Sequence, residues 1–218
     1  MYLEGIFVSG DIRSQLPEEA KKFDEKNKLF KTIMTDTYRD PLIKKQCHVP
    51  SRLADLESIF VGLERCQKSL NDYLDSKRNA FPRFFFISDD ELLSILGSAE
   101  PSAIQEHMIK MFDNIASLRL VKVSDTMTQA QAMISAEKEE MQFKQSVPTD
   151  GRVEDWMTKV LEEMRRTNKM ITKEAVYYYR FRKTRVGWMY NYQGMVVLAT
   201  NQIWFAFACF FLVKVDRI

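Results

Sequence analysis

A repeating apolar pattern over residues 51–77 is the feature that most constrains how this chain can fold. Apolar residues recur there at steps of three and four positions: Leu53, Leu56, Ile59, Phe60, Leu63, Cys66, Leu70, Tyr73 and Leu74. Because an α-helix turns once every 3.6 residues, these side chains share one face, and charged residues fill the remaining positions. The pattern predicts a long amphipathic helix whose apolar stripe faces a partner.

Further helices are predicted on both sides of this one. Residues 16–39 open with Pro-Glu-Glu, which suits the first turn of a helix, and carry apolar residues near helical spacing at Phe23, Phe30, Ile33, Met34 and Tyr38. Ser88 and Glu91 match a capping box, and Gly97 is placed to end the helix that follows. Two more helices are expected, one over residues 101–115 and one in the last third of the chain, where Trp156, Val160, Met164, Thr167 and Ile171 step by three and four.

The remaining segments indicate extended structure. Residues 81–87 are aromatic and contain Pro82, which predicts a buried extended segment. Partial alternation between residues 118 and 146 predicts a small antiparallel meander, closed by residues 148–151. The predicted fold is therefore mainly α, an elongated bundle of amphipathic helices with a small β meander. We expect four parts: helical residues 1–116, the meander at 117–150, helical residues 151–204, and a hydrophobic tail at 205–218.

Composition excludes several classes of function. The 32 Lys and Arg nearly cancel the 30 Asp and Glu, so the whole-chain charge does not indicate a polyelectrolyte partner such as nucleic acid. Three widely spaced Cys argue against a disulfide scaffold and fit a reducing compartment. A P-loop needs the pattern G-x-x-x-x-G-K-[ST], but none of the seven Gly precedes a Lys. No G-x-G-x-x-G occurs either, so neither of these two phosphate-binding motifs is present. We predict no catalytic, cofactor-binding or metal-binding residue on this chain.

Three small groups could carry chemistry, and each has a simpler structural explanation. Cys47 and His48, with Cys66, offer metal ligands, but a structural zinc site needs a second pair of ligands. His107 stands within a predicted helix, where a structural histidine is commoner than a catalytic base. The acids at residues 89–91 could serve as catalytic carboxylates, but the capping box and the helix dipole already explain them.

Two longer stretches leave alternatives open. Residues 165–185 interleave basic and aromatic side chains, which can build a nucleic-acid groove, although a solvated helix face is the commoner cause. Residues 195–213 are apolar over a length that fits a membrane span, which would suit a tail-anchored membrane or scaffold protein. A buried core helix over the first half of this run, residues 195–204, is the simpler interpretation.

Two blocks of sequence resemble the linker region of dynein heavy chains, in the same order and at similar spacing. The first block comprises QKSLNDYL at 67–74, KR at 77–78 and FPRFFFISDDELL at 81–93. The second comprises VEDW at 153–156, EMRRT at 163–167, KEA at 173–175 and NQIW at 201–204. The resemblance covers about residues 2–204, and it is closest to the axonemal, inner-arm type.

The resemblance implies a mechanical role. In that family the linker is a curved, mostly helical lever lying across a ring of AAA+ modules, and it bends and straightens as the ring turns over ATP. The chain would then be part of the linker of an ATP-driven, minus-end-directed microtubule motor for ciliary or flagellar movement. ATP and magnesium would bind only elsewhere in the full-length motor, so this chain would not itself be an enzyme.

The resemblance also implies partners and a location. The expected partners are the AAA+ ring of the same heavy chain, dynein intermediate and light chains, and microtubules, with neither nucleic acid nor a membrane expected. The expected location is the cytoplasm and cytoskeleton, in the axoneme of a cilium or flagellum. Breaker residues cluster at 97–101 and 148–151, where we expect any bending.

The chain departs from the family pattern near its end. Residues 205–213 are apolar where the family continues with a further Trp and a polar, acidic helix, and Gly187 stands where the family tends to have an acid. This tail resembles an alternative or truncated end of a longer chain.

Overall fold

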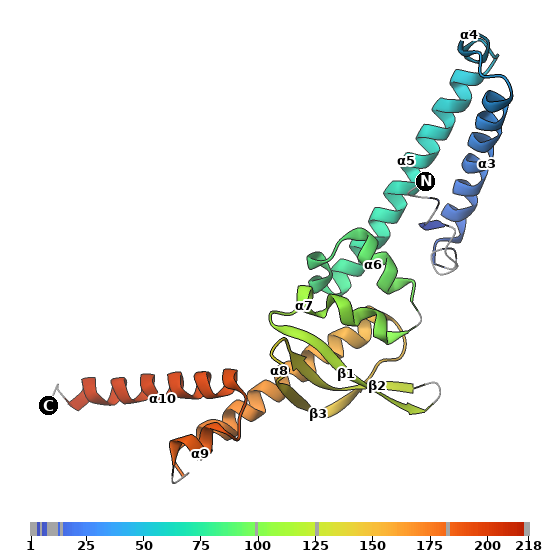
Figure 1. Cartoon of the computed structure of the whole chain (residues 1–218). Coiled ribbons are helices and arrows are strands. Elements are labelled where there is room, and N and C mark those ends of the chain that lie inside the picture. The colour runs from blue at the N-terminus through green and yellow to red at the C-terminus, as the bar shows by residue number, and fades with distance from the viewer. Residues whose placement is uncertain are drawn as a thin grey trace. The chain divides into compact units, whose positions relative to one another are not determined.

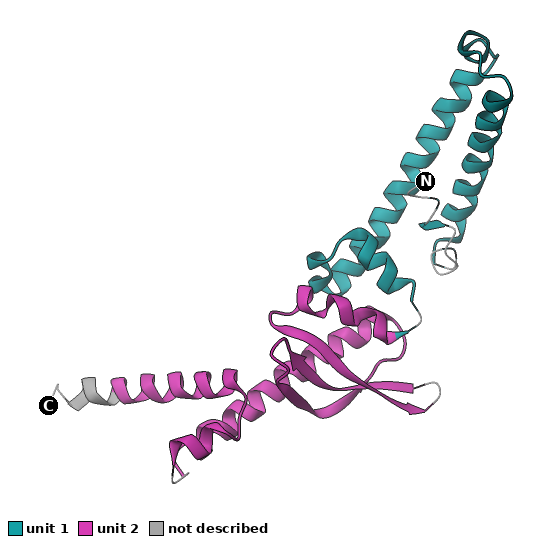
Figure 2. Cartoon of the chain, in the orientation of Figure 1, with its two compact units in different colours: residues 1–100 teal, residues 101–218 magenta. Residues whose placement is uncertain are grey.

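A computed structural model describes residues 4, 6–7, 13, 15–98, 100–124, 127–181 and 184–215, and the side chains of these up to residue 210. The chain divides into two compact units, Met1–Glu100 and Pro101–Ile218 (Figures 1 and 2). Each unit is mainly helical, and the second also holds a three-stranded antiparallel sheet. The predicted fold class, mainly α with a small antiparallel meander, is confirmed. The predicted division into four parts stays a prediction.

Unit 1 is built on a helical hairpin. Helix α3 (Pro17–Arg39) and helix α5 (Arg52–Ala80) lie side by side and run in opposite directions, joined through the short helix α4 (Ile43–Cys47) (Figure 1). Both long helices were predicted within three residues of their observed ends. Pro17 occupies the first turn of α3 together with Glu18 and Glu19, as expected for the positive end of a helix dipole.

The apolar faces of the hairpin are only partly buried. On α3, Phe23 and Ile33 are buried, but Phe30, Met34 and Tyr38 are exposed. On α5 the buried residues are Ile59, Cys66, Leu70 and Leu74. Leu53, Leu56 and Phe60 remain exposed. The periodicity therefore identified the helices correctly but not how much of each stripe this unit covers.

The aromatic segment after α5 differs from its prediction. Residues Pro82–Phe86 form a 3-10 helix, η1, rather than an extended segment. Phe81, Phe84 and Ile87 are buried, whereas Phe85 and Phe86 are 60% and 65% exposed. A 3-10 helix has three residues per turn, so every third side chain points the same way, and Pro82 is well suited to its first position. The prediction of a buried extended segment was therefore wrong.

Helix α6 (Asp89–Leu96) follows, and its predicted capping box is confirmed. The Ser88 hydroxyl accepts a hydrogen bond from the Glu91 amide, and the Glu91 carboxylate accepts one from the Ser88 amide. Asp89 pairs with Arg78 of α5 at 2.5 Å. Gly97 caps the end of α6 as expected.

Unit 2 opens with two short helices instead of the predicted single helix over residues 101–115. Residues Pro101–His107 form the 3-10 helix η2, residues Met108–Met111 form α7, and a strand begins at Ile115. Asn114 adopts a left-handed backbone conformation with φ 59°, which stops helical winding. The apolar side chains Ile104, Met108 and Met111 are buried nonetheless.

The meander consists of three antiparallel strands in the order β1-β2-β3. These are β1 (Ile115–Ser124), β2 (Met127–Ser135) and β3 (Glu140–Pro148). In the first pairing Leu118 lies opposite Met133, and in the second Met133 lies opposite Met141. The strands are longer than the alternation suggested because bulges interrupt it at several positions.

Three helices complete unit 2. Helix α8 (Val153–Tyr178) begins just after Gly151, whose φ of 79° lies in the left-handed region that glycine tolerates. Helix α9 (Arg185–Met189) is capped by the Thr184 hydroxyl, and helix α10 (Gly194–Val215) follows. The helix predicted from the spacing of Trp156 to Ile171 is confirmed.

Candidate functional site: the sheet and the aromatic joint on α8

Helix α8 carries the sheet of unit 2. The helix packs along β3, and its apolar stripe is buried: Trp156, Met157, Val160 and Met164. The buried side chains of the strands are Leu118, Ala130, Ala132, Met133, Met141, Phe143 and Val147. This apolar layer is the core of the unit, and it fixes the sheet along one side of the helix (Figure 1).

Two buried polar side chains of α8 bond directly to the backbone of β3. The Lys144 amide donates to the Thr167 hydroxyl at 3.1 Å, and the Gln145 amide donates to the Glu163 carboxylate at 2.9 Å. The Thr167 hydroxyl also donates to Glu163 at 3.1 Å. Glu163 is 6% exposed and Thr167 is fully buried, so these bonds are shielded from competition with water.

A second polar contact covers the opposite edge of the sheet. The Gln105 amide side chain of η2 donates to the Leu118 carbonyl and accepts from the Leu118 amide, both at 2.8 Å. This pair of bonds imitates a neighbouring strand at that point of β1. The sheet is therefore attached to helical elements at both edges, and strand slippage would break hydrogen bonds as well as apolar contacts.

The C-terminal end of α8 forms an aromatic joint with the two helices that follow. The Trp188 indole donates to the Ala175 carbonyl at 3.1 Å, and the Trp204 indole donates to the Val176 carbonyl at 3.2 Å. Both carbonyls lie in the last turn of α8, and the Ala175 carbonyl also accepts a hydrogen bond from the Tyr179 amide at 2.9 Å. The two indoles thus bond the end of α8 to α9 and α10.

Tyr179 lies at the centre of this joint. Its ring stacks on Trp204 with centroids 5.5 Å apart and meets Trp188 edge-on at 5.0 Å. The Arg185 guanidinium lies 3.3 Å from the centroid of the Tyr179 ring, and Arg180 lies 5.8 Å from that of Trp204. These cation–π contacts hold the arginines against the rings on the surface of the unit.

The first turns of α10 are attached to the sheet as well as to α8. The Gln193 side chain donates to the Glu140 carbonyl at 3.0 Å, and the Gly194 amide donates to the Glu139 carboxylate at 3.2 Å. The acid at this position also suits the positive end of the helix dipole. Val196, Val197 and Thr200 are buried, so the start of α10 is held by packing and by hydrogen bonds.

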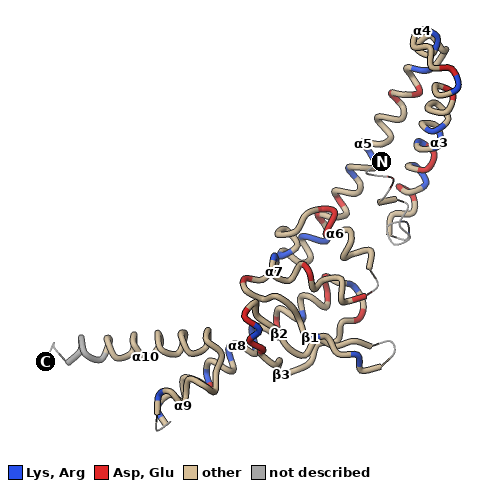
Figure 3. Tube along the Cα trace, viewed as in Figure 1, with Lys and Arg blue, Asp and Glu red and all other residues tan. Residues whose placement is uncertain are grey.

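The rest of α10 is largely uncovered. Leu198, Phe205 and Phe210 are exposed, and residues 194–210 of the helix include no Lys, Arg, Asp or Glu (Figure 3). The expectation of a buried core helix over residues 195–204 therefore holds for one face only, because Met195, Leu198 and Ile203 are exposed. In the part of the chain that the structure describes, no helix has both the length and the apolar composition to cross a membrane.

The structure places the candidate metal ligands and His107 as follows. Cys47 is exposed, and the ring of His48 bonds to the Lys44 carbonyl of its own short helix. Cys66 is buried in the hairpin, and burial raises the pKa of its thiol. Within the described residues, no three His, Cys, Asp or Glu side chains are grouped to hold a metal. His107 is half-buried at the end of η2.

Several of the acids at 89–91 and of the basic residues at 165–185 form contacts within the fold. Asp89 bonds to Arg78 beside the capping box. In the basic stretch, Arg166 contacts Gln145 at 2.6 Å, and Arg180 and Arg185 lie on aromatic rings of the joint. Two further cations of that stretch, at 182 and 183, lie outside the described residues.

The two segments where bending was expected differ in how they are held. The boundary between the compact units falls between Glu100 and Pro101, inside the segment 97–101. In the segment 148–151, the Thr149 amide and hydroxyl both donate to the Thr128 carbonyl, at 3.0 and 2.9 Å. These bonds tie the second segment to β2.

Sequence reasoning missed the polar side chains that position the sheet. Glu163 and Thr167 follow Trp156 and Val160 at helical steps, so a helical projection places all four on the apolar face of α8. A carboxylate inside an apolar stripe was the available signal. Gln105 and Glu139 gave no comparable signal, because their roles depend on tertiary contacts.

Comparison with known proteins identifies the class to which this fold belongs. Residues 1–175 match the family described as "Dynein heavy chain, N-terminal region 2". The chain belongs to the dynein heavy chain family. The match covers all of unit 1 and most of unit 2, including the sheet and nearly all of α8.

The chain is similar to individual axonemal heavy chains over nearly its whole length. It is 65% identical to human "Dynein axonemal heavy chain 10" over 94% of this chain, and 50% identical over 94% to "Dynein-1-alpha heavy chain, flagellar inner arm I1 complex" of Chlamydomonas reinhardtii. It is 41% identical to human "Dynein axonemal heavy chain 2" over 93%. The chain spans only 4–5% of the length of these relatives.

Proposed function

We propose that this chain forms part of the linker of an axonemal dynein heavy chain and transmits force from the ATP-driven ring to a microtubule. The observation that carries the proposal is the 65% identity to a human axonemal heavy chain over 94% of the chain. ATP hydrolysis and magnesium binding are assigned to other parts of the heavy chain. The axoneme of a cilium or flagellum is the location that follows from the names of the relatives.

The packing of unit 2 supports a force-bearing role. A lever must resist deformation, and a packed apolar core with buried hydrogen bonds is stiff. The sheet is bonded to α8 through Glu163 and Thr167, and the end of α8 is bonded to the following helices through Trp188 and Trp204. Displacing one of these elements would therefore disturb its neighbours.

The partners of the proposed lever are the AAA+ ring of the same heavy chain and, through the assembled motor, intermediate chains, light chains and microtubules. The described residues contribute exposed apolar side chains that contact with a ring could cover, such as Phe205 and Phe210 of α10. The hinge would lie in segment 97–101, at the boundary between the two units.

Energy transfer in a full-length heavy chain tests this proposal. One probe replaces Tyr190, which is 87% exposed in unit 2, and the other is placed on the first AAA+ module. A lever that bends during the ATP cycle gives different transfer efficiencies in the nucleotide-free and ATP-bound states.

The matched control places both probes within unit 2, at Tyr190 and at Val123, which is 56% exposed on β1. Because these positions belong to one compact unit, their transfer efficiency should stay constant. Equal efficiencies in every nucleotide state for the ring-to-lever pair would contradict the proposed role.

A further inference from the structure

The two long helices of unit 1 each carry a heptad pattern, in which apolar positions alternate at steps of three and four. On α5 the positions are Leu53, Leu56, Phe60, Leu63, Gln67, Leu70 and Leu74. At the residue before α3 and along α3 the positions are Leu16, Ala20, Phe23, Asn27, Phe30, Met34 and Thr37, of which Asn27 and Thr37 are polar. Such a seam is typical of coiled coils, in which each seam residue inserts between four residues of a facing helix.

Residues 23–30 of the α3 seam and residues 56–67 of the α5 seam border one open groove. The groove has a volume of about 520 Å³, and its lining includes Phe23, Asn27 and Phe30 of α3 and Leu56, Phe60, Leu63 and Gln67 of α5. These seven are seam positions, and the remaining lining residues, Glu4, Lys26 and Ile59, lie beside the seams. Phe60 is 62% exposed, Phe30 is 42% exposed and Leu56 is 41% exposed, so the apolar part of the groove is uncovered within the hairpin.

The two helices approach each other mainly beside these seams. The Cys66 thiol is buried and lies 3.8 Å from the Glu19 carbonyl. The stem of Lys26 lies against Gly62, where an added Cβ would come within 2.8 Å of it, and its ammonium group donates to the Ser58 hydroxyl. The helices are therefore already in close contact, and they cannot close over the groove by moving together.

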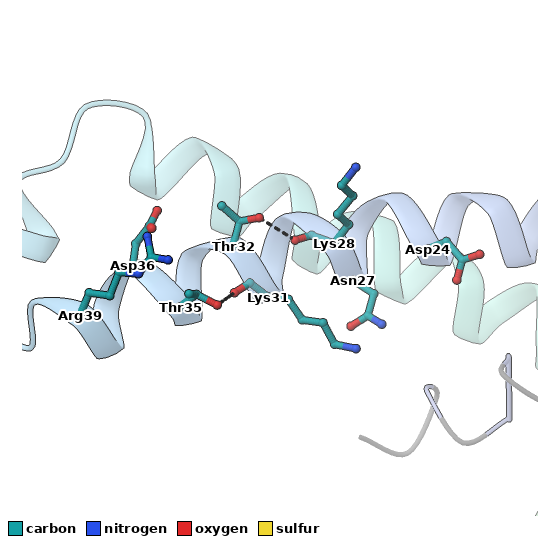
Figure 4. A pocket seen from close by; sticks show the side chains of 8 residues that line it. All are labelled: Asp24, Asn27, Lys28, Lys31, Thr32, Thr35, Asp36 and Arg39. Carbon is teal, nitrogen blue, oxygen red and sulfur yellow. Dashed lines mark hydrogen bonds between the residues drawn. The ribbon is translucent and has the colours of Figure 1, made fainter.

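A second hollow on α3 has a different character. It is lined by residues of α3 alone: Asp24, Asn27, Lys28, Lys31, Thr32, Thr35, Asp36 and Arg39 (Figure 4). The hydroxyls of Thr32 and Thr35 donate to the Lys28 and Lys31 carbonyls of their own helix. This polar hollow lacks opposing walls, so the apolar groove between the helices is the stronger candidate for a docking surface.

Acidic residues beside the α5 seam indicate what kind of helix can bind in the groove. Glu57 and Glu64 follow the seam residues Leu56 and Leu63 directly, so they line the outer border of the seam, two helical turns apart. Both are exposed, and within the described residues neither forms a hydrogen bond or an ion pair. In coiled coils, charges at such flanking positions pair with opposite charges on the facing helix. The facing helix should therefore carry Lys or Arg along this border.

We propose that a third amphipathic helix of the same heavy chain docks in the groove between α3 and α5, completing a three-helix coiled coil. Its apolar seam covers Phe30, Leu56 and Phe60, and its basic border pairs with Glu57 and Glu64. The relatives are about twenty times as long as this chain, so a heavy chain that contains this segment holds most of its polypeptide elsewhere. A tethered segment also has a high effective concentration at the groove. The inference rests on family membership and not on the proposed lever function.

Photo-cross-linking in a full-length heavy chain that contains this segment tests the proposal. p-Benzoylphenylalanine replaces Phe60, the chain is irradiated and digested, and cross-linked peptides are identified by mass spectrometry. The expected product joins position 60 to a peptide of the same heavy chain that has heptad apolar spacing and Lys or Arg residues beside the seam. The matched control carries the same probe at Asp72, which is exposed on α5 away from the seam.

Several results would overturn the proposal. These are a cross-link only to an intermediate or light chain, a cross-link only between isotopically distinct copies of the heavy chain, and a yield no higher than that from position 72. The charge prediction has its own test. The double variant Glu57→Lys with Glu64→Lys should lower the cross-link yield about two- to tenfold, the effect of losing two exposed ion pairs. Glu25→Lys with Asp36→Lys, at exposed positions off the seam of α3, should leave the yield unchanged.

Discussion

The sheet of unit 2 and the helical hairpin of unit 1 are held together in different ways. In unit 2, buried side chains such as Glu163 and Thr167 bond to strand backbone, and the apolar stripe of α8 is covered by the sheet. In unit 1, α3 and α5 share a narrower buried contact, and large apolar residues such as Phe30 and Phe60 stay exposed. One region uses its apolar surface internally, and the other leaves part of that surface available.

This difference teaches that amphipathic spacing measures the apolar surface a helix offers, not how much of it a given unit covers. Both α5 and α8 show an apolar stripe at helical spacing in the sequence. In α8 the stripe includes the polar residues Glu163 and Thr167, which have specific backbone partners. In the seam of α5 the only polar residue is Gln67, which lines an open groove. A helix whose apolar stripe is covered within its own unit and a helix whose stripe stays partly exposed can therefore show the same apolar spacing in the sequence.

The largest expected effect comes from truncating a buried side chain of α8. Trp156 is 2% exposed, so Trp156→Ala should lower the free energy of unfolding by about 3–5 kcal/mol through lost burial and the cavity left behind. Phe60→Ala in the hairpin, where the side chain is 62% exposed, should change it by less than about 1 kcal/mol. Urea unfolding followed by far-ultraviolet circular dichroism measures both.

The contrast between the two units would be wrong if Trp156→Ala and Phe60→Ala lowered the free energy of unfolding by the same amount. An equally large loss from Phe60→Ala would mean that the groove is closed in the isolated chain. A small loss from Trp156→Ala would mean that the sheet contributes little to the stability of unit 2.

A smaller effect is expected from the hydrogen bonds between α8 and β3. Glu163→Ala removes the buried carboxylate that accepts from the Gln145 amide and should cost about 1–3 kcal/mol. Glu163→Gln retains a side-chain oxygen that can accept the same bond, so its cost should be lower. Hydrogen exchange at the Gln145 amide reports on the bond directly, with faster exchange in the alanine variant.

Glu162→Ala serves as the control, because Glu162 is exposed on the same turn of α8. Its effect on Gln145 exchange should be negligible. If exchange at Gln145 were unchanged in Glu163→Ala, the sheet would be held to α8 by apolar packing alone, and the contrast with the hairpin would be one of degree.

Sequence alone predicted the elements whose cause is local. The capping box at Ser88 and Glu91 depends on residues three apart, and the helices over residues 17–39 and 52–80 depend on apolar spacing within each segment. The failures occurred where tertiary contact decides. Residues 81–87 form a 3-10 helix with two exposed phenylalanines, and the predicted helix over 101–115 ends early to begin a strand.

The candidate site was less predictable than the fold. Trp188 and Trp204 cap the end of α8 from positions 13 and 28 residues away from their carbonyl partners. Gln105 covers the edge of a strand 13 residues further along the chain. No local pattern identifies such pairings, because a Trp or Gln side chain bonds to whichever backbone group the fold brings near it.

The smallest expected effects concern surface carboxyl groups, and each unit has one whose pKa is lowered by a hydrogen bond. In unit 1, a hydrogen bond and the charge of Lys45 lower the pKa of Asp40 below its ordinary value of 3.8. In unit 2, a hydrogen bond from the Asn114 side chain lowers the pKa of Glu137 below its ordinary value of 4.5. Each ionised carboxylate therefore stabilises the folded chain above the ordinary pKa, and that contribution is lost as the pH falls through the lowered value.

Salt should separate the two carboxyl groups. The partner of Asp40 is a cation, so about 0.5 M salt should move the pKa of Asp40 back toward 3.8 by screening. The partner of Glu137 is a neutral amide, so the pKa of Glu137 should respond less to salt, while Asn114→Ala should raise it. Carbon-13 titration of both carboxyl groups by nuclear magnetic resonance measures these shifts. An equal response to salt would show that net charge, rather than the hydrogen bond from Asn114, controls the pKa of Glu137. The two surface carboxyl groups would then not differ in what lowers their pKa.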